Sequence, residues 1–314
     1  MEYIKLKRLE FAITYNCSSK CEHCFIDENR KKKYPGTIKP DIAESIVRKL
    51  ASNYDIESIM TFGGEPLLYP ELIYQIHKTA RELGIKSRQI ITNAYWSKNE
   101  EKINAIAKDL LNSGVNNVFI SVDVFHQKHI PLSIIKKTAE SLINNGVEMI
   151  KWNPCWLVSK DEDNKYNQKT KEILKELNYL GAKVSSGNIV SPNGLALKNL
   201  LEYMPAKIKY PKGKCGDQPY TSNLDNIESI CIDPNGDIAI CSNLKIGNVF
   251  EANILDVLKN YNPYEVEEMR CILEKGMDGL MEYASKENIT LNPDGYYSIC
   301  DMCQDIISAS DYCK

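Results

Sequence analysis

From Leu9 to about Ile208, short runs rich in β-branched residues alternate with longer amphipathic segments. This alternation is typical of repeated strand-helix units on a parallel sheet. The predicted strands are Glu10–Thr14, Ser58–Phe62, Ser87–Thr92, Asn117–Val122, Glu148–Pro154 and Lys183–Ile189. The predicted helices are Pro40–Asn53, Pro70–Leu83, Glu100–Ser113, Leu132–Asn145 and Lys165–Leu180. Six units are too few to close an eight-stranded barrel, so we expect an α/β fold, a partial (β/α)6 TIM-like barrel with its site at the C-terminal strand ends.

The regular alternation ends after Leu200, where a segment rich in proline and lysine follows. The sequence therefore predicts a barrel domain over residues 1–205 and a smaller domain over residues 206–314. Within the second domain, ICIDPNGDIAICSNLKIGNVFE indicates a β-hairpin that turns at Pro234, Asn235 and Gly236.

The chain has 39 basic and 42 acidic side chains. It therefore lacks the excess of basic residues that is expected of a dedicated nucleic-acid binder. The N-terminal segment is too interrupted by charge for a secretory signal, and no apolar run reaches membrane-spanning length, so we expect a cytoplasmic protein without a membrane partner.

Eleven cysteines are many for a cytoplasmic protein, because cytosolic thiols gain little from disulfides. Their clustering in two regions indicates two metal sites.

The first cysteine group, Cys17, Cys21 and Cys24, follows the first predicted strand with the spacing C-x3-C-x2-C. Three thiolates on one tight loop each bind one iron of a 4Fe-4S cube and leave the fourth iron open to another ligand. The alternative is a zinc site in which His23 supplies the fourth ligand.

This spacing after the first strand of a βα series resembles the radical SAM superfamily, and the resemblance extends over essentially the whole chain. It implies that the open iron chelates the amino and carboxylate groups of S-adenosylmethionine. One-electron reduction then cleaves the sulfonium to methionine and a 5′-deoxyadenosyl radical. The sequence departs from the family at His23, because an aromatic residue usually precedes the third cysteine.

Polar residues at the predicted strand ends are candidates for the co-substrate site. Gly63, Gly64 and Glu65 look like the family's GGE motif, in which the glycines let the backbone approach a ligand and the acid accepts from the amino group of S-adenosylmethionine. The other candidate cofactor contacts are Thr92 and Asn93 after the third strand, Ser121 and Asp123 after the fourth, and Asn153 on the fifth. Strand-end capping is the alternative role of Ser121 and Asp123. The segment around Gly194 resembles the family's GRA-like turn near the nucleoside.

The second cysteine group supplies four thiolates that would hold one auxiliary 4Fe-4S cluster, namely Cys215, Cys241, Cys300 and Cys303. Zinc bound by the same four is the alternative, and Cys231 would replace Cys215 if Cys215 is not a ligand. Cys271 and Cys313 lack a partner spacing. The arrangement of hairpin, IGN turn and terminal C-x2-C resembles the SPASM or Twitch extension of radical SAM enzymes.

The SICxxC ending and the SVDVFH segment resemble peptide epimerases of the epipeptide type, which implies hydrogen abstraction from a ribosomally made peptide. In that family a cysteine directly after the one at position 241 returns a hydrogen atom, whereas here Ser242 occupies the position. Cys155 is the substitute hydrogen donor, and its alternative role is that of a small residue in the core.

We therefore expect a radical SAM peptide maturase that performs cross-linking, epimerisation or a related change. Its expected partner is an electron donor such as flavodoxin or ferredoxin. The alternatives are a radical enzyme that acts on a small molecule or nucleotide, and a zinc-binding protein without catalysis.

Overall fold

The computed structural model describes residues 2–26, 28–218, 221–310 and 312. It divides into two compact units. The barrel unit comprises Arg8–Met204 with Asp233–Asn235, and the C-terminal unit comprises Met1–Lys7, Pro205–Ile232 and Gly236–Lys314. The sequence placed the boundary between residues 205 and 206, and the structure places it after Met204. The first seven residues also belong to the C-terminal unit and not to the barrel unit. Cys313 lies outside the described residues.

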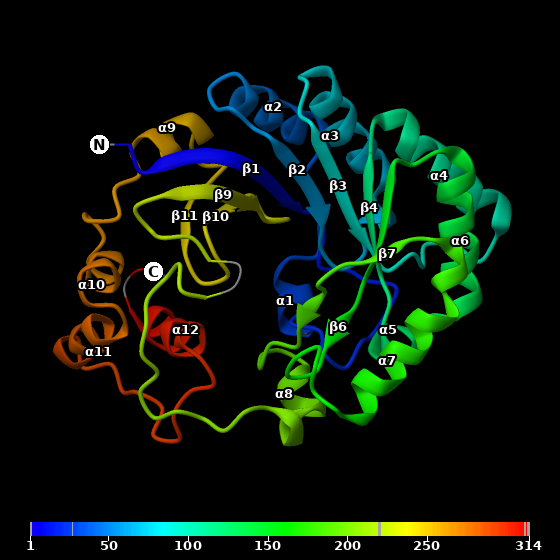
Figure 1. The fold of residues 1–314 in the computed structure, drawn as a ribbon. Helices are drawn as coiled ribbons and strands as arrows, with labels where there is room; N and C mark the ends of the chain where they lie inside the picture. The colour runs from blue at the N-terminus through cyan, green and yellow to red at the C-terminus, as the bar shows by residue number, and fades with distance from the viewer. Residues whose placement is uncertain (1, 27, 219–220, 311, 313–314) are drawn as a thin grey trace. The chain divides into compact units, whose positions relative to one another are not determined.

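The barrel unit is built on a parallel sheet with the strand order β1, β2, β3, β4, β5 and β7 (Figure 1). These strands are β1 (Ile4–Ala12, of which residues 8–12 belong to this unit), β2 (Ser58–Phe62), β3 (Ser87–Thr92), β4 (Asn117–Ser121), β5 (Met149–Asn153) and β7 (Lys183–Val184). Adjacent strands pair in register without irregularity, for example Leu9 with Ile59 and Ile90 with Val118. The expected α/β fold with a mostly parallel sheet is confirmed.

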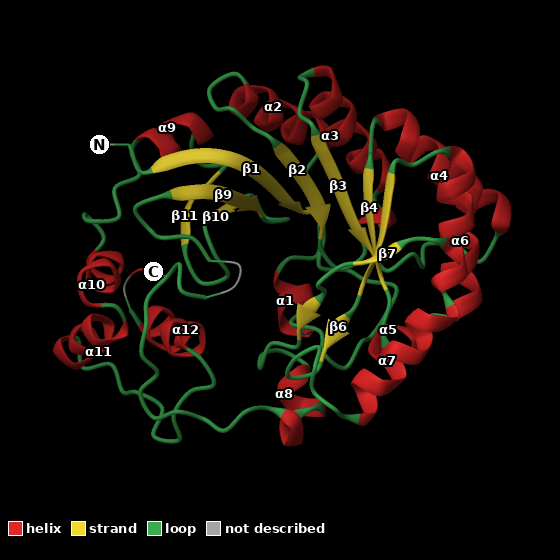
Figure 2. Cartoon of the chain, in the orientation of Figure 1, coloured by secondary structure: helices red, strands yellow, loops and turns green. Residues whose placement is uncertain are grey.

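The amphipathic helices α2, α3, α4 and α6 lie along the outer side of the sheet (Figure 2). The helices of this unit are α1 (Glu28–Lys33), α2 (Pro40–Ala51), α3 (Pro70–Glu82), α4 (Glu100–Ser113), α5 (Val124–Gln127), α6 (Leu132–Asn145), α7 (Lys165–Glu176) and α8 (Ala196–Asn199). Short 3-10 turns occupy Pro66–Leu68, Asn178–Leu180 and Leu201–Tyr203. Helices α4 and α6 end at Gly114 and Gly146, whose φ angles of 97° and 88° give the left-handed cap that glycine adopts easily.

Buried aliphatic side chains on both layers form the core of the barrel unit. Ile59 and Ile90 on the strands are fully buried, as are Val47 and Ile73 on the helices. Burial of each such side chain contributes about 1.5–3 kcal/mol, which favours packing of the helices on the sheet.

The sixth predicted strand, Lys183–Ile189, was wrong as a single element. Residues Lys183–Val184 form β7, while β8 (Asn188–Ile189) leaves the main sheet and pairs with β6 (Cys155–Trp156). The break lies at Gly187, where φ is 74° and an added Cβ would lie 2.4 Å from the Pro154 carbonyl oxygen. The close approach of two backbones therefore requires glycine here and redirects the chain.

In its described residues, the C-terminal unit contains an antiparallel hairpin and four helices. Its strands are β9 (Ile227–Ile232), β10 (Asp237–Ala239) and β11 (Lys245–Asn248). Its helices are α9 (Ile254–Lys259), α10 (Glu267–Lys275), α11 (Met277–Lys286) and α12 (Ile299–Ala309). Strand β10 pairs antiparallel with both β9 and β11, so the predicted hairpin is confirmed. Within the described residues, no helix is long and apolar enough to cross a membrane.

Candidate active site

The first cysteine group lies on the loop between β1 and α1 of the barrel unit. Its three thiols are close enough to influence one another electrostatically, since Cys21 is affected by both Cys17 and Cys24. Burial is the main cause that raises the pKa of Cys17 to about 11, that of Cys21 to about 12, and that of Cys24 above its ordinary value. Buried thiols of this kind are neutral by themselves, so a bound cation is needed to hold them as thiolates.

Several hydrogen-bond donors point at these sulfur atoms. The backbone N–H of Ser19 donates to Cys17 Sγ at 3.4 Å, and the hydroxyl of Ser19 lies 3.0 Å from Cys21 Sγ. The side-chain amide of Asn93 donates to Cys17 Sγ at 3.4 Å, and the backbone N–H of Ile26 donates to Cys24. Because neutral thiols are weak acceptors, donors aimed at three sulfurs fit thiolates that ligate a metal cluster.

Glu65 lies at the end of β2 and is fully buried. Its carboxyl group accepts hydrogen bonds from the Thr92 hydroxyl at 2.7 Å, the Asn93 backbone N–H at 2.8 Å and the Leu67 backbone N–H at 3.0 Å. Burial raises the pKa of Glu65 to about 7 despite these donors. The structure thus brings Glu65, Thr92 and Asn93 together, and Asn93 connects them to the cysteine loop. Such a carboxyl group favours a cationic ligand, which would restore its charge.

The two glycines before Glu65 contact the chain's own backbone. A Cβ on Gly64 would lie 2.0 Å from the Asn16 carbonyl oxygen, and one on Gly63, where φ is 144°, would lie 2.5 Å from the Thr14 carbonyl oxygen. The Gly64 N–H donates to Thr14 O at 2.7 Å, and the Glu65 N–H donates to Asn16 O at 2.8 Å. The sequence predicted a close approach to a ligand. The structure shows a close approach to the segment that enters the cysteine loop.

The predicted contacts after β4 lie at the same end of the sheet. Ser121 is the last residue of β4, and Asp123 is fully buried as the N-cap of α5. The Asp123 carboxylate accepts from the backbone N–H groups of Phe125, His126 and Cys155, each at 2.9 Å, and from Nδ1 of His126. Burial alone would raise the pKa of Asp123, but the charge and hydrogen bond of His126 outweigh it and lower the pKa to about 2.

This set of partners gives Asp123 a capping role, which the sequence had offered as the alternative to a cofactor contact. The sequence did not single out His126 as its partner, although the segment SVDVFH placed both residues together. The ring of His126 also packs edge-on against His23, with 5.0 Å between the ring centroids. This contact joins the end of β4 to the cysteine loop.

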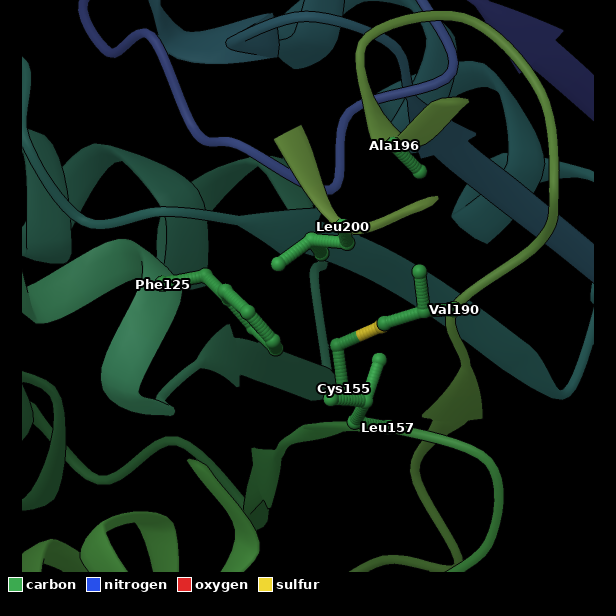
Figure 3. Packing of buried hydrophobic residues seen from close by; sticks show 6 residues of the cluster. All are labelled: Phe125, Cys155, Leu157, Val190, Ala196 and Leu200. Atoms are coloured by element: carbon green, nitrogen blue, oxygen red, sulfur yellow. The ribbon is translucent and has the colours of Figure 1, made fainter. Parts of the chain in front are cut away.

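Asn153 ends β5 of the main sheet, and Cys155 follows two residues later in the separate β6–β8 pair. The side-chain oxygen of Asn153 accepts from the Ser185 hydroxyl at 2.8 Å. Cys155 begins β6 and is buried in an apolar cluster, whose members Figure 3 shows as Phe125, Leu157, Val190, Ala196 and Leu200. Burial raises the pKa of Cys155 well above its ordinary value. The thiol is therefore protonated, as a hydrogen-atom donor requires, and that role stays a prediction.

The segment around Gly194 packs against the cysteine loop. The backbone N–H of Leu195 donates to Cys24 O at 2.8 Å, and a Cβ on Gly194 would lie 2.6 Å from the Phe25 carbonyl oxygen. The φ angle of Gly194 is 54°, so both the conformation and the contact require glycine. This turn therefore fixes the end of the cysteine loop.

The second cysteine group is brought together within the C-terminal unit. Cys303 is influenced electrostatically by Cys241, Cys215 and Cys300, so all four predicted thiols lie near one another. Cys300 and Cys303 belong to the first turns of α12, and Cys241 follows β10. Burial raises the pKa of all four, that of Cys215 to about 12.

Polar groups are also directed at this second group. The Asn243 side chain donates to the Cys300 carbonyl oxygen at 2.9 Å and to the thiol of Cys303, and backbone N–H groups of Asn243 and Leu244 donate to Cys241. Cys231 lies opposite Ala239 in the hairpin. Hydrogen-bond donors therefore reach the sulfur atoms of Cys241 and Cys303, which would stabilise their thiolates.

In the described part of the chain, no three His, Cys, Asp or Glu side chains are close enough together to hold a single metal ion. An iron-sulfur cube binds each thiolate through a different iron, so its ligands surround the cube and do not meet at one point.

Comparisons with known proteins agree with this geometry. A family model for the radical SAM superfamily matches residues 11–195, more than half of the chain. A probable GTP 3′,8-cyclase of Saccharolobus islandicus (strain L.S.2.15 / Lassen #1) is 28% identical over 117 residues, which cover 37% of this chain and 35% of that protein. The GTP 3′,8-cyclase of Clostridium botulinum (strain Okra / Type B1) is 25% identical over 166 residues, 51% of this chain and 50% of that protein. The chain thus spans half or less of the length of these curated relatives.

Among solved structures, native anSMEcpe with bound AdoMet superposes with a TM-score of 0.53 at 16% identity, covering 82% of this chain and 81% of that one. This likeness shows a shared fold. The family match over residues 11–195 shows what the cysteine spacing implied: the chain belongs to the radical SAM superfamily.

Proposed function

We propose that the barrel unit binds S-adenosylmethionine beside a 4Fe-4S cluster held by Cys17, Cys21 and Cys24. The observation that carries this proposal is the contact chain from the Cys17 sulfur through Asn93 to the buried carboxyl group of Glu65. When bound, the cluster and S-adenosylmethionine supply the 5′-deoxyadenosyl radical that abstracts hydrogen from the substrate.

The residues around this site have separate tasks in the proposal. Glu65 accepts from the ammonium group of S-adenosylmethionine, and Thr92 and Asn93 hold its carboxylate in place. Ser121 is the candidate contact to the carboxylate and ribose of the co-substrate, and Asn153 is the candidate contact to its adenosine. The apolar cluster around Cys155 keeps water away from the same end of the sheet, which protects a carbon-centred radical.

For the substrate, we propose a small molecule or nucleotide as the first candidate. The relatives from Saccharolobus islandicus and Clostridium botulinum are a probable and a named GTP 3′,8-cyclase, and the substrate in these names is a nucleotide. Nucleotides are therefore the first class to test.

Peptide maturation is the second candidate, favoured by the four thiols of the C-terminal unit and by its hairpin. We propose that Cys215, Cys241, Cys300 and Cys303 hold one auxiliary 4Fe-4S cluster in an arrangement similar to the SPASM or Twitch extension. Ser242 stands where an epimerase needs its hydrogen-donor thiol, so cross-linking fits this chain better than inversion.

The radical chemistry is tested by anaerobic reconstitution with iron and sulfide, followed by reduction with dithionite. We expect about eight irons per chain, as two 4Fe-4S clusters require, and 5′-deoxyadenosine as a product of S-adenosylmethionine. Flavodoxin or ferredoxin should replace dithionite as the electron donor. Absence of both the iron and 5′-deoxyadenosine would refute the proposal.

The substrate class is tested by incubating the reduced enzyme with GTP and other nucleotides, and separately with short peptides encoded beside the gene. A nucleotide substrate increases 5′-deoxyadenosine formation and changes the mass of the nucleotide. A peptide that loses two hydrogens has been cross-linked, and one that gains a single deuterium in deuterated water has been epimerised. A response to peptides alone would reverse the order of the two candidates.

A further inference from the structure

Asn93 contacts both halves of the proposed site through different atoms. Its backbone N–H donates to Oε2 of Glu65 at 2.8 Å, and its side-chain Nδ2 donates to Sγ of Cys17 at 3.4 Å. The residue is 5% exposed and lies directly after β3. One residue therefore touches the carboxyl group of the co-substrate site and a ligand of the cluster.

The orientation of the Asn93 amide is fixed by its neighbours. The backbone N–H of Tyr95 donates to Oδ1 of Asn93 at 2.8 Å, and a carbonyl oxygen is the only end of the amide that accepts such a bond. The NH2 end must then face Cys17. The turn itself is held by the Ala94 backbone N–H, which donates to the Thr92 hydroxyl at 3.0 Å. Ala94 has a φ angle of 61°, so the turn is tight.

The two contacts of Asn93 are separable by mutation. A side-chain substitution leaves the backbone N–H to Glu65 in place and removes only the donor to sulfur. Substitution of Ser18 is the matched control, because its hydroxyl contacts the Asn93 amide at 3.2 Å. It leaves in place the donor to the Cys17 sulfur, which is Nδ2 of Asn93.

An N–H group that donates to a ligating sulfur stabilises negative charge on the cluster. Reduction adds one negative charge, so the donor favours the reduced state and raises the reduction potential. In a buried site this effect is screened little by water.

We propose that Asn93 is a positioning residue which sets the reduction potential of the first cluster through Cys17, while its backbone holds Glu65 for the co-substrate. This inference rests on the proposed function, namely a 4Fe-4S cluster on Cys17, Cys21 and Cys24. The resemblance to the family implied only that Asn93 contacts the cofactor.

The test is a redox titration of the reconstituted enzyme, monitored by the electron paramagnetic resonance signal of the reduced first cluster. A background with Cys303→Ser removes the proposed second cluster and leaves one signal. In Asn93→Ala we expect the equilibrium constant for reduction to fall about tenfold, which is about 59 mV for one electron. In Asn93→Asp, where Oδ1 still accepts from Tyr95 but an anionic oxygen faces Cys17, we expect a larger fall. Ser18→Ala should change the constant less than twofold.

The titration separates failure of this inference from failure of the proposed function. If the parent enzyme assembles the cluster and both Asn93 variants reduce at its potential, the inference is overturned and the function stands. A parent enzyme that assembles no cluster on Cys17, Cys21 and Cys24 overturns both. Addition of S-adenosylmethionine should still alter the signal of Asn93→Ala, because the Glu65 contact is kept. Loss of that response would show that the side chain, and not the backbone, holds Glu65.

Discussion

Both oxygens of the Asp123 carboxylate lie within hydrogen-bonding distance of Nδ1 of His126, at 2.9 and 2.8 Å. The same carboxylate accepts from the backbone N–H of Phe125 and of Cys155. One fully buried side chain thus joins the end of β4, the start of α5 and the start of β6. These donors satisfy the hydrogen-bonding capacity of a carboxylate that is fully buried.

We predict that Asp123→Asn destabilises the fold by about 3 kcal/mol. The amide NH2 group of asparagine cannot accept from the backbone donors that face it, and buried donors without partners are costly. His126→Gln serves as the control, because it removes the ring but leaves the backbone bonds to Asp123, and should cost about 1–2 kcal/mol. Urea unfolding under reducing conditions measures both values. Equal losses in the two variants would contradict the capping role.

The free energy of unfolding should depend on pH through Glu65, and the burial of this residue sets the sign of the dependence. Its pKa is raised from 4.5 to about 7 in the folded state, so the folded protein binds a proton more tightly than the unfolded chain. Stability from this group is complete below pH 4.5 and is lost as the pH rises through 7, by about 3 kcal/mol in total. Relative to Glu65→Gln, the parent protein should lose about 3 kcal/mol between pH 4 and pH 8.

Unfolding by urea at several pH values, without S-adenosylmethionine, measures the difference between the two proteins. Parallel stability curves for the parent and Glu65→Gln would show that the folded-state pKa is not raised. Added S-adenosylmethionine should reduce the loss at pH 8, since its ammonium group favours the ionised carboxyl group.

The thiols of the C-terminal unit predict a change in iron content. Replacing Cys303 by serine should lower the iron from about eight to about four per chain and leave 5′-deoxyadenosine formation measurable, because the first cluster is separate. Cys271→Ser is the matched control in α10, and its iron content should equal that of the parent. Cys215→Ser and Cys231→Ser, compared in the same assay, identify the fourth ligand. Iron retained in Cys303→Ser would exclude the proposed ligand set.

Gly64 is predicted to be essential for the cysteine loop. In Gly64→Ala the added Cβ would lie 2.0 Å from the Asn16 carbonyl oxygen, and backbone must move to relieve this contact. We expect a loss of about 3 kcal/mol or more and poor assembly of the first cluster. Gly36→Ala is the control, because nothing lies within 4 Å of its Cβ position. Thermal melting and iron analysis of both variants check the prediction, which fails if they behave alike.

The sequence by itself determined the parts of the fold that depend on neighbouring residues. Strands Ser58–Phe62 and Ser87–Thr92 and helices Glu100–Ser113 and Leu132–Asn145 have the predicted bounds. Periodicity and the capping glycines at 114 and 146 act within a few residues, so they can be read directly from the chain. The cysteine spacing likewise indicated the superfamily before the fold was known.

Other features required the tertiary structure. The split of Lys183–Ile189 into β7 and β8 depends on the approach of Gly187 to Pro154, which no local pattern encodes. The role of Gly64 likewise depends on the segment at Asn16, which lies in another part of the sequence.

The contact chain from Cys17 through Asn93 to Glu65 joins residues from three separate strand ends. The sequence determined which strands end in polar residues and which loop carries the thiols. Only the tertiary structure decided which atoms meet, because hydrogen-bond partners far apart in the chain are chosen by the register and twist of the folded sheet.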